Sequence, residues 1–297
     1  MRLLVTGSAG QVGHALAALA RQRQMEVRAY DRAALDVTDA DAVDHAVAGA
    51  AGSGPLAVVN CAAYTAVDRA ESEPEASFAV NRDGAAHLAA ACDRHGAALV
   101  HVSTDYVFDG RRDEPYHEGD PVNPLSVYGE SKWAGEEAVR QRLERHAIVR
   151  TAWVFSARGR NFVRTIARLL RERDEVRVVA DQTGHPTWAG HLAEGLLTIG
   201  SGLASGGATG TFHLAGTPPT SWYGLAQAVL QEVRLPASRQ RPTLLPISTE
   251  AYPTAARRPR CVLLSMERVR KHYISQDVEW AGGLPHALRS IPTYVDE

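Results

Sequence analysis

The chain has 297 residues, of which 45% are hydrophobic and 22% are charged, a composition typical of a globular protein with a buried core and unlike that of disordered or fibrous chains. Its formal net charge of -2 gives no global field that would attract nucleic acid or an anionic membrane, so we expect neither partner. Three widely spaced cysteines without a CxxC pair, and histidines without ligand spacing, argue against a disulfide framework and against any metal site.

The first predicted strand, residues 2–6, runs directly into a glycine-rich turn that is followed by a helix. Its apolar run is too short for a secretory signal or a membrane span, so we expect a cytoplasmic protein. The turn contains Gly7, Gly10 and Gly13. Glycines there let the backbone approach a pyrophosphate, and the helix N-terminus offers unpaired N–H groups to it. The spacing is GxxGxxG rather than GxGxxG, but its place between strand and helix favours a dinucleotide site over a simple tight turn.

The second predicted strand, residues 26–30, ends at Asp31 and Arg32, where a dinucleotide-binding fold meets the adenosine ribose. An acid there suits a free 2′-hydroxyl and an arginine suits a 2′-phosphate, so both NADH and NADPH stay open. Asp36 and Val37 follow at the expected adenine edge, although Asp36 is equally well placed to cap the next helix.

Further short runs rich in β-branched residues occur at 56–60, 98–103 and 147–155. Between them lie stretches such as 11–24 and 81–96, which carry apolar residues at three- and four-residue steps. This alternation predicts an α/β fold with a doubly wound parallel sheet of the Rossmann type.

After about residue 155 the sequence pattern changes: short predicted strands, a Gly/Ser-rich stretch at 201–210 and Pro- and Arg-rich segments follow. We therefore predict an NAD(P)-binding Rossmann domain over residues 1–153. Residues 154–297 would form mainly a smaller, interleaved substrate-binding region, with parts that return to the first domain.

The fourth predicted strand ends in Ser103 and Thr104. Residues beyond the carboxyl ends of parallel strands line the ligand crevice of such sheets, so either hydroxyl can hydrogen-bond a substrate carbonyl. The alternative is that the two residues only begin a turn.

Tyr128 and Lys132 are four residues apart in a predicted helix, which places both on one face. With nine tyrosines and only two lysines in the chain, about 0.06 such pairs are expected by uniform placement, so the spacing is a meaningful motif. A free tyrosine has a pKa of about 10, and a neighbouring ammonium together with an oxidised nicotinamide would lower it toward 7. Tyr128 is therefore the predicted general acid or base.

These motifs resemble the extended short-chain dehydrogenase/reductases. Several longer blocks, among them VHVSTDYVFDG, VYGESKWAGE and ADQTGHPT, are more specifically similar to the dTDP-4-dehydrorhamnose reductase family over residues 1 to about 260. The resemblance implies reduction of the C4 keto group of a dTDP-linked deoxysugar by NADPH or NADH, with Thr104 orienting the carbonyl, Tyr128 donating the proton and Lys132 holding the nicotinamide ribose.

The resemblance also implies which other residues bind cofactor and substrate. Those that would bind the cofactor are Gly7, Gly10, Gln11, Val12, Gly13, Asp31, Arg32, Asp36, Val37, Ala62, Ala63 and Tyr64, with Tyr128 and Lys132. Those that would bind the nucleotide sugar are Thr65, Val67, Thr104, Asp105, Tyr106, Trp153, Trp222 and Arg258. For the tryptophans the competing interpretation is core packing, and for Arg258 it is a solvated loop.

The chain departs from the family pattern at two places that belong to one metal site. Some members carry magnesium-binding glutamates at a dimer interface, where this chain has Ala15 and the pair Gly190-His191. We therefore predict no such metal site, while a homodimer stays open as the assembly. The competing functions are a 4-ketoreductase of another nucleotide-linked deoxysugar, a nucleotide-sugar epimerase and a non-catalytic regulatory subunit.

Overall fold

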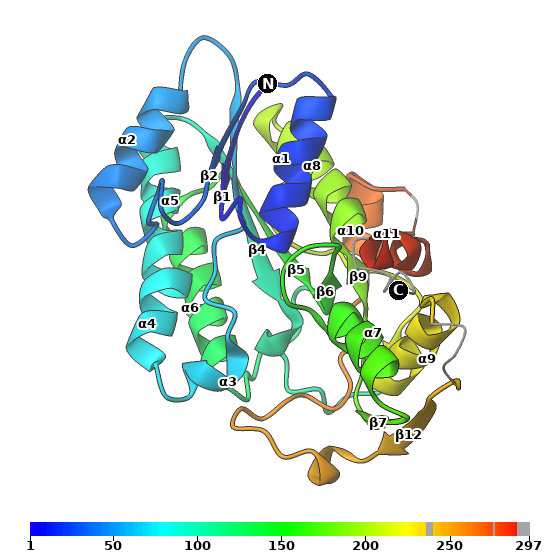
Figure 1. Cartoon of the computed structure of the whole chain (residues 1–297). Coiled ribbons are helices and arrows are strands. Elements are labelled where there is room, and N and C mark those ends of the chain that lie inside the picture. The colour runs from blue at the N-terminus through cyan, green and yellow to red at the C-terminus, as the bar shows by residue number, and fades with distance from the viewer. Residues whose placement is uncertain (236–239, 276, 290–297) are drawn as a thin grey trace.

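A computed structural model describes residues 1–235, 240–275 and 277–289 (Figure 1). The last residues of the predicted second region, 290–297, lie outside this part of the chain, as do residues 236–239 and 276.

A six-stranded, fully parallel sheet forms the centre of the molecule, with strand order β10-β5-β4-β3-β1-β2. The strands are β1 (Arg2–Thr6), β2 (Val27–Tyr30), β3 (Leu56–Asn60), β4 (Ala98–Thr104), β5 (His146–Thr151) and β10 (Gly210–His213). The chain order reverses between β1 and β3, which is the topological switch point where α/β sheets bind ligands. The predicted doubly wound sheet is confirmed.

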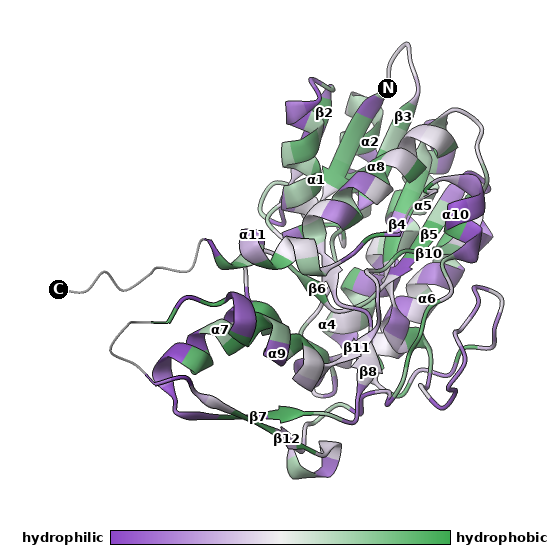
Figure 2. Cartoon of the chain, turned by 90° about the vertical axis from the view of Figure 1, so that its right-hand side faces the viewer, coloured by the Kyte–Doolittle hydropathy of each residue, from purple (hydrophilic) through white to green (hydrophobic). Residues whose placement is uncertain are grey.

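Helices cover both faces of this sheet (Figure 1). One face carries α1 (Gln11–Gln22) and α8 (Ala189–Ala204), and the other carries α2 (Ala40–Ala50), α5 (Gly84–Arg94) and α6 (Val127–Arg142). Side chains alternate between the two cores as a strand requires: Leu3 and Val5 pack toward α1 and α8, whereas Leu4 packs toward α2 and α5. Figure 2 shows the resulting hydrophobic central strands and the hydrophilic outer faces of the helices.

Short helical elements follow β3 and β4. Between β3 and α5 lie α3 (Val67–Ala70), α4 (Pro74–Phe78) and a π-helical turn at Ala79–Asp83, and a 3-10 turn at Asp105–Val107 follows β4. They pack against α6 and so bring the loops after β3 and β4 close to one another.

The predicted strand over 147–155 is wrong in its length, because β5 ends at Thr151. Trp153 has a φ of 43°, a left-handed conformation that interrupts an extended chain. The chain turns there, and Val154 and Phe155 form β6, which pairs with β9 (Thr187–Trp188) in a separate two-stranded sheet.

A second core lies at one end of the sheet and is formed by Phe155, Val163, Leu170, Leu225 and Trp280, among others. The elements around it are α7 (Phe162–Glu172), β7 (Glu175–Val179), β8 (Thr183–Gly184), β11 (Thr220–Ser221), α9 (Trp222–Glu232), β12 (Thr243–Ile247) and α11 (Leu284–Leu288). Between them, α10 (Glu267–His272) returns to the side of β10. Within the described ranges no helix is long and apolar enough to cross a membrane.

Candidate active site

The turn between β1 and α1 is built by two of its glycines. Gly7 has a φ of 66°, and a β-carbon there would lie 2.6 Å from the Ala62 backbone nitrogen. A β-carbon on Gly13 would overlap the Gly7 carbonyl oxygen, so this glycine lets α1 lie directly against the turn. Helix α1 begins after Gly10 without a side-chain cap, which leaves N–H groups of its first turn free of a capping side chain.

The side chain of Gln11 connects this turn to the second region. Its Oε1 accepts hydrogen bonds from Ser156 Oγ at 2.9 Å and from Asn161 Nδ2 at 2.8 Å, and its Nε2 donates to the Val154 carbonyl at 3.4 Å. Val12, the next residue, is half-buried against the core under α1. The glycine turn and residues 154–161 therefore form one continuous wall.

At the end of β2, the Asp31 carboxylate accepts a hydrogen bond from the Ala34 N–H at 3.0 Å, while the Arg32 side chain is 86% exposed. Asp36 does not cap α2: its carboxylate accepts from the Thr38 N–H and hydroxyl, and the cap is Asp39. These bonds from Thr38, with a smaller contribution from Arg32, lower the pKa of Asp36.

Val37, which follows Asp36, is buried in the core under α2 and contacts Gly84. Its side chain therefore packs into the protein interior, and any contact that it makes with an adenine ring comes from its backbone.

The loop after β3 contains Ala62, Ala63 and Tyr64, all half-buried. The Asn81 side chain fixes the backbone of this loop through two hydrogen bonds: it accepts from the Tyr64 N–H at 2.9 Å and donates to the Tyr64 carbonyl at 3.1 Å. The Tyr64 hydroxyl donates to Glu73 at 2.6 Å, and this bond raises the tyrosine pKa. Thr65 follows on the exposed side, and Val67 begins α3.

Thr104 and Tyr128 meet at the end of β4. Tyr128 is the second residue of α6, which begins after the Ser126 cap, and it is 9% exposed. The Thr104 hydroxyl is close enough to the Tyr128 phenol to influence its pKa. Thr104 Oγ1 also donates to Asp105 at 3.1 Å and accepts from the Tyr106 N–H, and the Tyr106 ring lies edge-on to Tyr128 at 5.6 Å.

The protein groups around Tyr128 raise its pKa, whereas the lowering predicted from the sequence depends on an oxidised nicotinamide together with the lysine. Burial raises the pKa to about 12, and the nearby Thr104 hydroxyl opposes this only in part. Burial likewise raises the pKa of Asp105 to about 7. The sequence predicts the neighbouring ammonium but not the loss of water around the phenol, and desolvation is the larger effect within the chain itself.

Lys132 is 1% exposed, one turn of α6 beyond Tyr128. Its Nζ donates to the Val102 carbonyl at 2.8 Å and lies 3.5 Å from His101 Nε2. Burial lowers the pKa of Lys132 to about 8, against the opposing attraction of Glu136. The lysine is therefore close to its point of charge change near neutral pH.

Glu136, another turn along α6, forms a fully buried ion pair with Arg150 on β5 at 2.7 Å. It also accepts from Ser103 at 2.6 Å and from Arg140 at 2.7 Å. Burial pushes the pKa of Glu136 up, but Arg150, Arg140 and Ser103 outweigh it and lower the pKa. Ser103 thus anchors α6 to the sheet, and Thr104 is the hydroxyl that faces Tyr128.

Trp153 and Trp222 stack on each other with ring centroids 3.5 Å apart and planes 6° apart. Trp222 also donates to Gln182 at 3.2 Å, and Trp153 lies over Gly184, where a β-carbon would come within 2.7 Å of the indole. Both rings are half-buried, so the pair forms a wall with one face of each ring already covered. No planar ligand fits between rings at this separation.

Arg258 pairs with Asp68 of α3 through two hydrogen bonds of 3.0 and 2.8 Å. Burial raises the pKa of Tyr106, and the positive charge of Arg258 opposes this rise, so Arg258 lies within electrostatic range of that tyrosine. The same segment reaches the tryptophan wall, because the Arg260 carbonyl accepts from the Thr183 N–H at 2.8 Å, next to Gly184. Residues 258–260 therefore bridge the two groups of predicted substrate residues.

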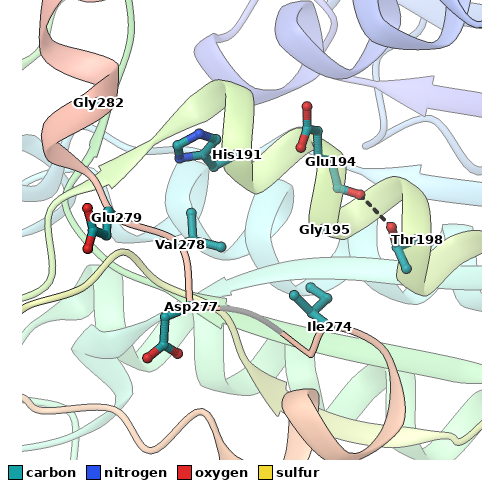
Figure 3. Close-up of a pocket in the computed structure, with 9 residues that line it drawn as sticks. All are labelled: His191, Glu194, Gly195, Thr198, Ile274, Asp277, Val278, Glu279 and Gly282. Atoms are coloured by element: carbon teal, nitrogen blue, oxygen red, sulfur yellow. Dashed lines mark hydrogen bonds between the residues drawn. The ribbon is translucent and has the colours of Figure 1, made fainter.

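A cavity of about 450 Å³ lies elsewhere, between α8 and residues 274, 277–279 and 282 (Figure 3). The described residues that line it include His191, Glu194, Asp277 and Glu279, and none of the predicted site residues is among them. In the part of the chain that the structure describes, no three His, Cys, Asp or Glu side chains come together to hold a metal ion.

The sequence interpretation missed the polar residues behind the site: Asn60, Asn81, His101, Glu136 and Arg150 are all 0 or 1% exposed. A signal for them was present. Asn60, His101 and Arg150 interrupt runs of apolar residues in buried strands, and Glu136 continues the four-residue step from Tyr128 to Lys132. Asp68, the partner of Arg258, had no such signal because it lies on an exposed helix.

Known proteins share both the sequence and the fold of this chain. The family model described as "RmlD substrate binding domain" matches residues 1–292. A dTDP-4-dehydrorhamnose reductase from Burkholderia thailandensis is 43% identical, covering 98% of this chain and 99% of that protein, and one from Aggregatibacter actinomycetemcomitans is 39% identical, covering 99% of each.

The crystal structure of dTDP-4-dehydrorhamnose reductase from Bacillus anthracis in complex with NADP superposes with a TM-score of 0.86 at 34% identity, over 95% of this chain and 96% of that one. A UDP-glucose 4-epimerase from Thermus thermophilus, in complex with NAD, has a TM-score of 0.80 at 22% identity and shares the fold. From the family model and the identity over full lengths, the chain belongs to the RmlD family, the family of the dTDP-4-dehydrorhamnose reductases.

Proposed function

We propose that this protein reduces the C4 keto group of dTDP-4-dehydro-L-rhamnose to give dTDP-L-rhamnose, with NADPH or NADH as the reductant. The observation that carries the proposal is the buried group of Thr104, Tyr128 and Lys132 at the carboxyl end of β4, in which α6 carries the tyrosine and, one turn later, the lysine. Full-length identity to proteins named for this reaction supports the substrate.

The turn after β1 fits a dinucleotide. Gly7 and Gly13 admit a close backbone approach, and the first turn of α1 has no capping side chain to compete with a pyrophosphate. Asp31 and the exposed Arg32 would meet the adenosine ribose. Arg32 pairs with the exposed Asp36, at 3.6 Å, and would exchange that partner for a 2′-phosphate, so either form of the cofactor is accommodated. Residues 62–64, Tyr128 and Lys132 would hold the nicotinamide half. The bound reduced cofactor supplies the hydride.

The chain itself handles the proton. The Thr104 hydroxyl orients the substrate carbonyl, and Tyr128 holds a proton on Oη and transfers it to the C4 oxygen as that oxygen becomes an alkoxide. A phenol whose pKa is raised by burial keeps its proton until an alkoxide is present. Lys132 stabilises the phenolate that results, and its buried amine is more effective there than in water.

The nucleotide sugar would lie between two groups of residues that segment 258–260 connects. Thr65, Val67, Asp105 and Tyr106 form one side, and the stacked Trp153 and Trp222 form the other. Arg258 would exchange its hydrogen bonds to the Asp68 carboxylate for hydrogen bonds to the diphosphate, because a guanidinium binds carboxylate and phosphate groups in the same bidentate geometry.

The experiment is steady-state oxidation of NADPH and of NADH in the presence of enzymatically prepared dTDP-4-dehydro-L-rhamnose, with wild type beside Tyr128→Phe. We expect one equivalent of cofactor to be consumed per keto sugar, and the variant to lose at least about 100-fold in kcat while it still binds the cofactor. If the wild type binds the cofactor but does not reduce this sugar, the substrate assignment is wrong and other 4-keto sugars are tested in the same assay.

We also propose a Rossmann domain at 1–153 and a mainly substrate-binding region at 154–297 that is interleaved with it and returns parts of its chain to the first domain. The separate core around Phe155 and Trp280 supports a second region, and the place of β10 in the first sheet supports the interleaving. A homodimer and a cytoplasmic location stay predictions, and sedimentation of the purified protein tests the first of them.

A further inference from the structure

A line of buried polar side chains runs behind Lys132 across three strands of the central sheet. It starts at Thr6 on β1, continues through Asn60 on β3 and His101 on β4, and ends at the lysine amine. Thr6, Asn60, His101 and Lys132 are each 0 or 1% exposed. Burying four polar side chains side by side is costly unless their donors and acceptors match, so their hydrogen-bond directions are constrained.

We propose that Asn60 and His101 are positioning residues for Lys132, because Asn60 holds His101 in the neutral tautomer whose Nε2–H faces the lysine amine. This inference rests on the proposed function only where it concerns turnover. The tautomer and its effect on the lysine are properties of the chain alone.

The orientation of the Asn60 amide is fixed by a group that can only donate. Asn60 Oδ1 lies 3.1 Å from the Ala62 backbone N–H, so this atom must be the amide oxygen. The same oxygen accepts from the Thr6 hydroxyl at 2.6 Å. The other amide atom is therefore the NH₂ group, and it points at His101.

The donor on Asn60 decides the state of His101. The Asn60 NH₂ group lies 3.0 Å from His101 Nδ1, which must therefore accept and carry no proton. Burial, followed by the charge of Lys132, holds the pKa of His101 well below its usual value, so the ring is neutral. A neutral ring that lacks a proton on Nδ1 carries it on Nε2, and Nε2 is the atom 3.5 Å from Lys132 Nζ.

An N–H aimed at an amine favours the uncharged form of that amine, which can accept, over the ammonium, which can only donate. The other groups around Lys132 do not cancel this preference. The Val102 carbonyl accepts one hydrogen bond from the lysine Nζ. Cys61, after β3, is a neutral thiol because burial raises its pKa to about 12. On α6, Glu136 attracts the ammonium but is already paired with Arg150 and Arg140.

For the proposed reaction, this arrangement keeps the lysine close to its point of charge change. The Tyr128 proton passes to the C4 oxygen, and Lys132 stabilises the phenolate left behind without taking up a proton itself. The lysine is held in place from behind by the Val102 carbonyl and by the His101 ring.

The test is Asn60→Asp, which keeps the size of the side chain and both of the contacts that Oδ1 accepts. The introduced carboxylate oxygen that faces His101 must accept, so the ring proton moves to Nδ1 and Nε2 presents a lone pair to Lys132. We expect the proton affinity of Lys132 to rise about tenfold, a shift of about one pH unit upward in its titration midpoint.

The readout is the pH titration of the side-chain signals of carbon-13-labelled lysine by NMR. The chain has only two lysines, and the exposed Lys271 serves as internal reference, with Lys271→Arg giving the assignment. Because no substrate is present, the result is independent of the proposed function. The alkaline limb of kcat/KM should shift by the same amount only if the proposed function is also right.

Two controls separate the tautomer from other effects. In the His101→Phe background, Asn60→Asp can act only through its charge, so we expect a clearly smaller shift than in the wild type. Thr6→Val removes one of the two Asn60 contacts that do not involve His101 and leaves the Ala62 contact, so we expect the Lys132 midpoint to stay unchanged.

An unmoved midpoint in folded Asn60→Asp, or an equal shift in the His101→Phe background, would overturn the inference. If Asn60→Asp does not fold, the nitrogen-15 spectrum of the wild-type histidines, with His101 identified by its absence from His101→Phe, decides it. A protonated Nδ1 there contradicts the inference, and a protonated Nε2 supports it.

Discussion

The smallest feature on which cofactor binding depends is the missing side chain at Gly13. A β-carbon there would overlap the Gly7 carbonyl oxygen, so Gly13→Ala must push α1 away from the turn that would hold the pyrophosphate. We expect Gly13→Ala to weaken NADPH binding at least about tenfold, measured by the fluorescence of the bound cofactor. Gly54→Ala is the control, because a β-carbon at Gly54 meets no atom within 4 Å. Equal affinities for the two variants would contradict this account of the turn.

A second consequence at this scale is a pH-dependent stability from Asp105. Burial raises its folded-state pKa from 3.8 to about 7, so the folded chain holds this proton more tightly than the unfolded chain does. The folded state is therefore most stable, as far as Asp105 is concerned, below pH 4, where the carboxyl group is protonated in both states. Its free energy of unfolding falls as the pH rises from 4 toward 7.

We expect Asp105→Asn, which cannot ionise, to gain stability relative to wild type over that window, by on the order of 4 kcal/mol if the whole shift is expressed. Urea unfolding of both proteins at several pH values measures it. A constant difference between them from pH 4 to 8 would show that Asp105 ionises as freely as in water.

The residue pair at the centre of the site could be predicted from the sequence, because two lysines and nine tyrosines make the Tyr128–Lys132 spacing improbable by chance. The direction of the Tyr128 pKa could not. It depends on how much water the fold removes from the phenol, and no count of neighbouring charges contains that quantity.

At the scale of elements, α6 is the part of the structure that sets the active geometry. It carries Tyr128, Lys132 and Glu136 on successive turns, and the Ser126 hydroxyl caps it by accepting from the Gly129 N–H at 3.2 Å. The first turn of this helix therefore positions the proposed proton donor.

We expect Ser126→Ala and Asp39→Ala, which remove the caps of α6 and α2, each to lower the free energy of unfolding by about 1 kcal/mol. Only Ser126→Ala should also lower kcat, by several-fold, since Tyr128 lies in the frayed turn. Chemical denaturation and the reductase assay on both variants test this, and an equal loss of kcat in both would assign the effect to general instability.

Most strands and helices of the first half follow from apolar periodicity alone, whereas the errors have local causes. The strand expected over 147–155 breaks at Trp153, which has a left-handed conformation and packs against Trp222 and Gly184, residues far away in sequence. The cap of α2 is Asp39 and not Asp36, a choice between two nearby acids that only the turn geometry decides.

At the scale of the whole molecule, two cores meet along the carboxyl ends of the strands. Residues 210–213 supply the sixth strand of the first sheet, although they lie well inside the second half of the chain. The sequence indicated a change of pattern and an interleaved region, but not which segment of it joins the central sheet. Short strands that follow loops carry little periodic signal. The bridge made by residues 258–260 was equally beyond sequence patterns.

The central claim is that hydride reaches C4 of the sugar and stays there. The most direct measurement is one reaction with NADPH that carries deuterium at the transferable position of the nicotinamide, followed by NMR of the nucleotide sugar. The account predicts one deuterium at C4 of dTDP-L-rhamnose for each cofactor oxidised. A sugar converted without deuterium and without net loss of NADPH would contradict it and would indicate an epimerase instead.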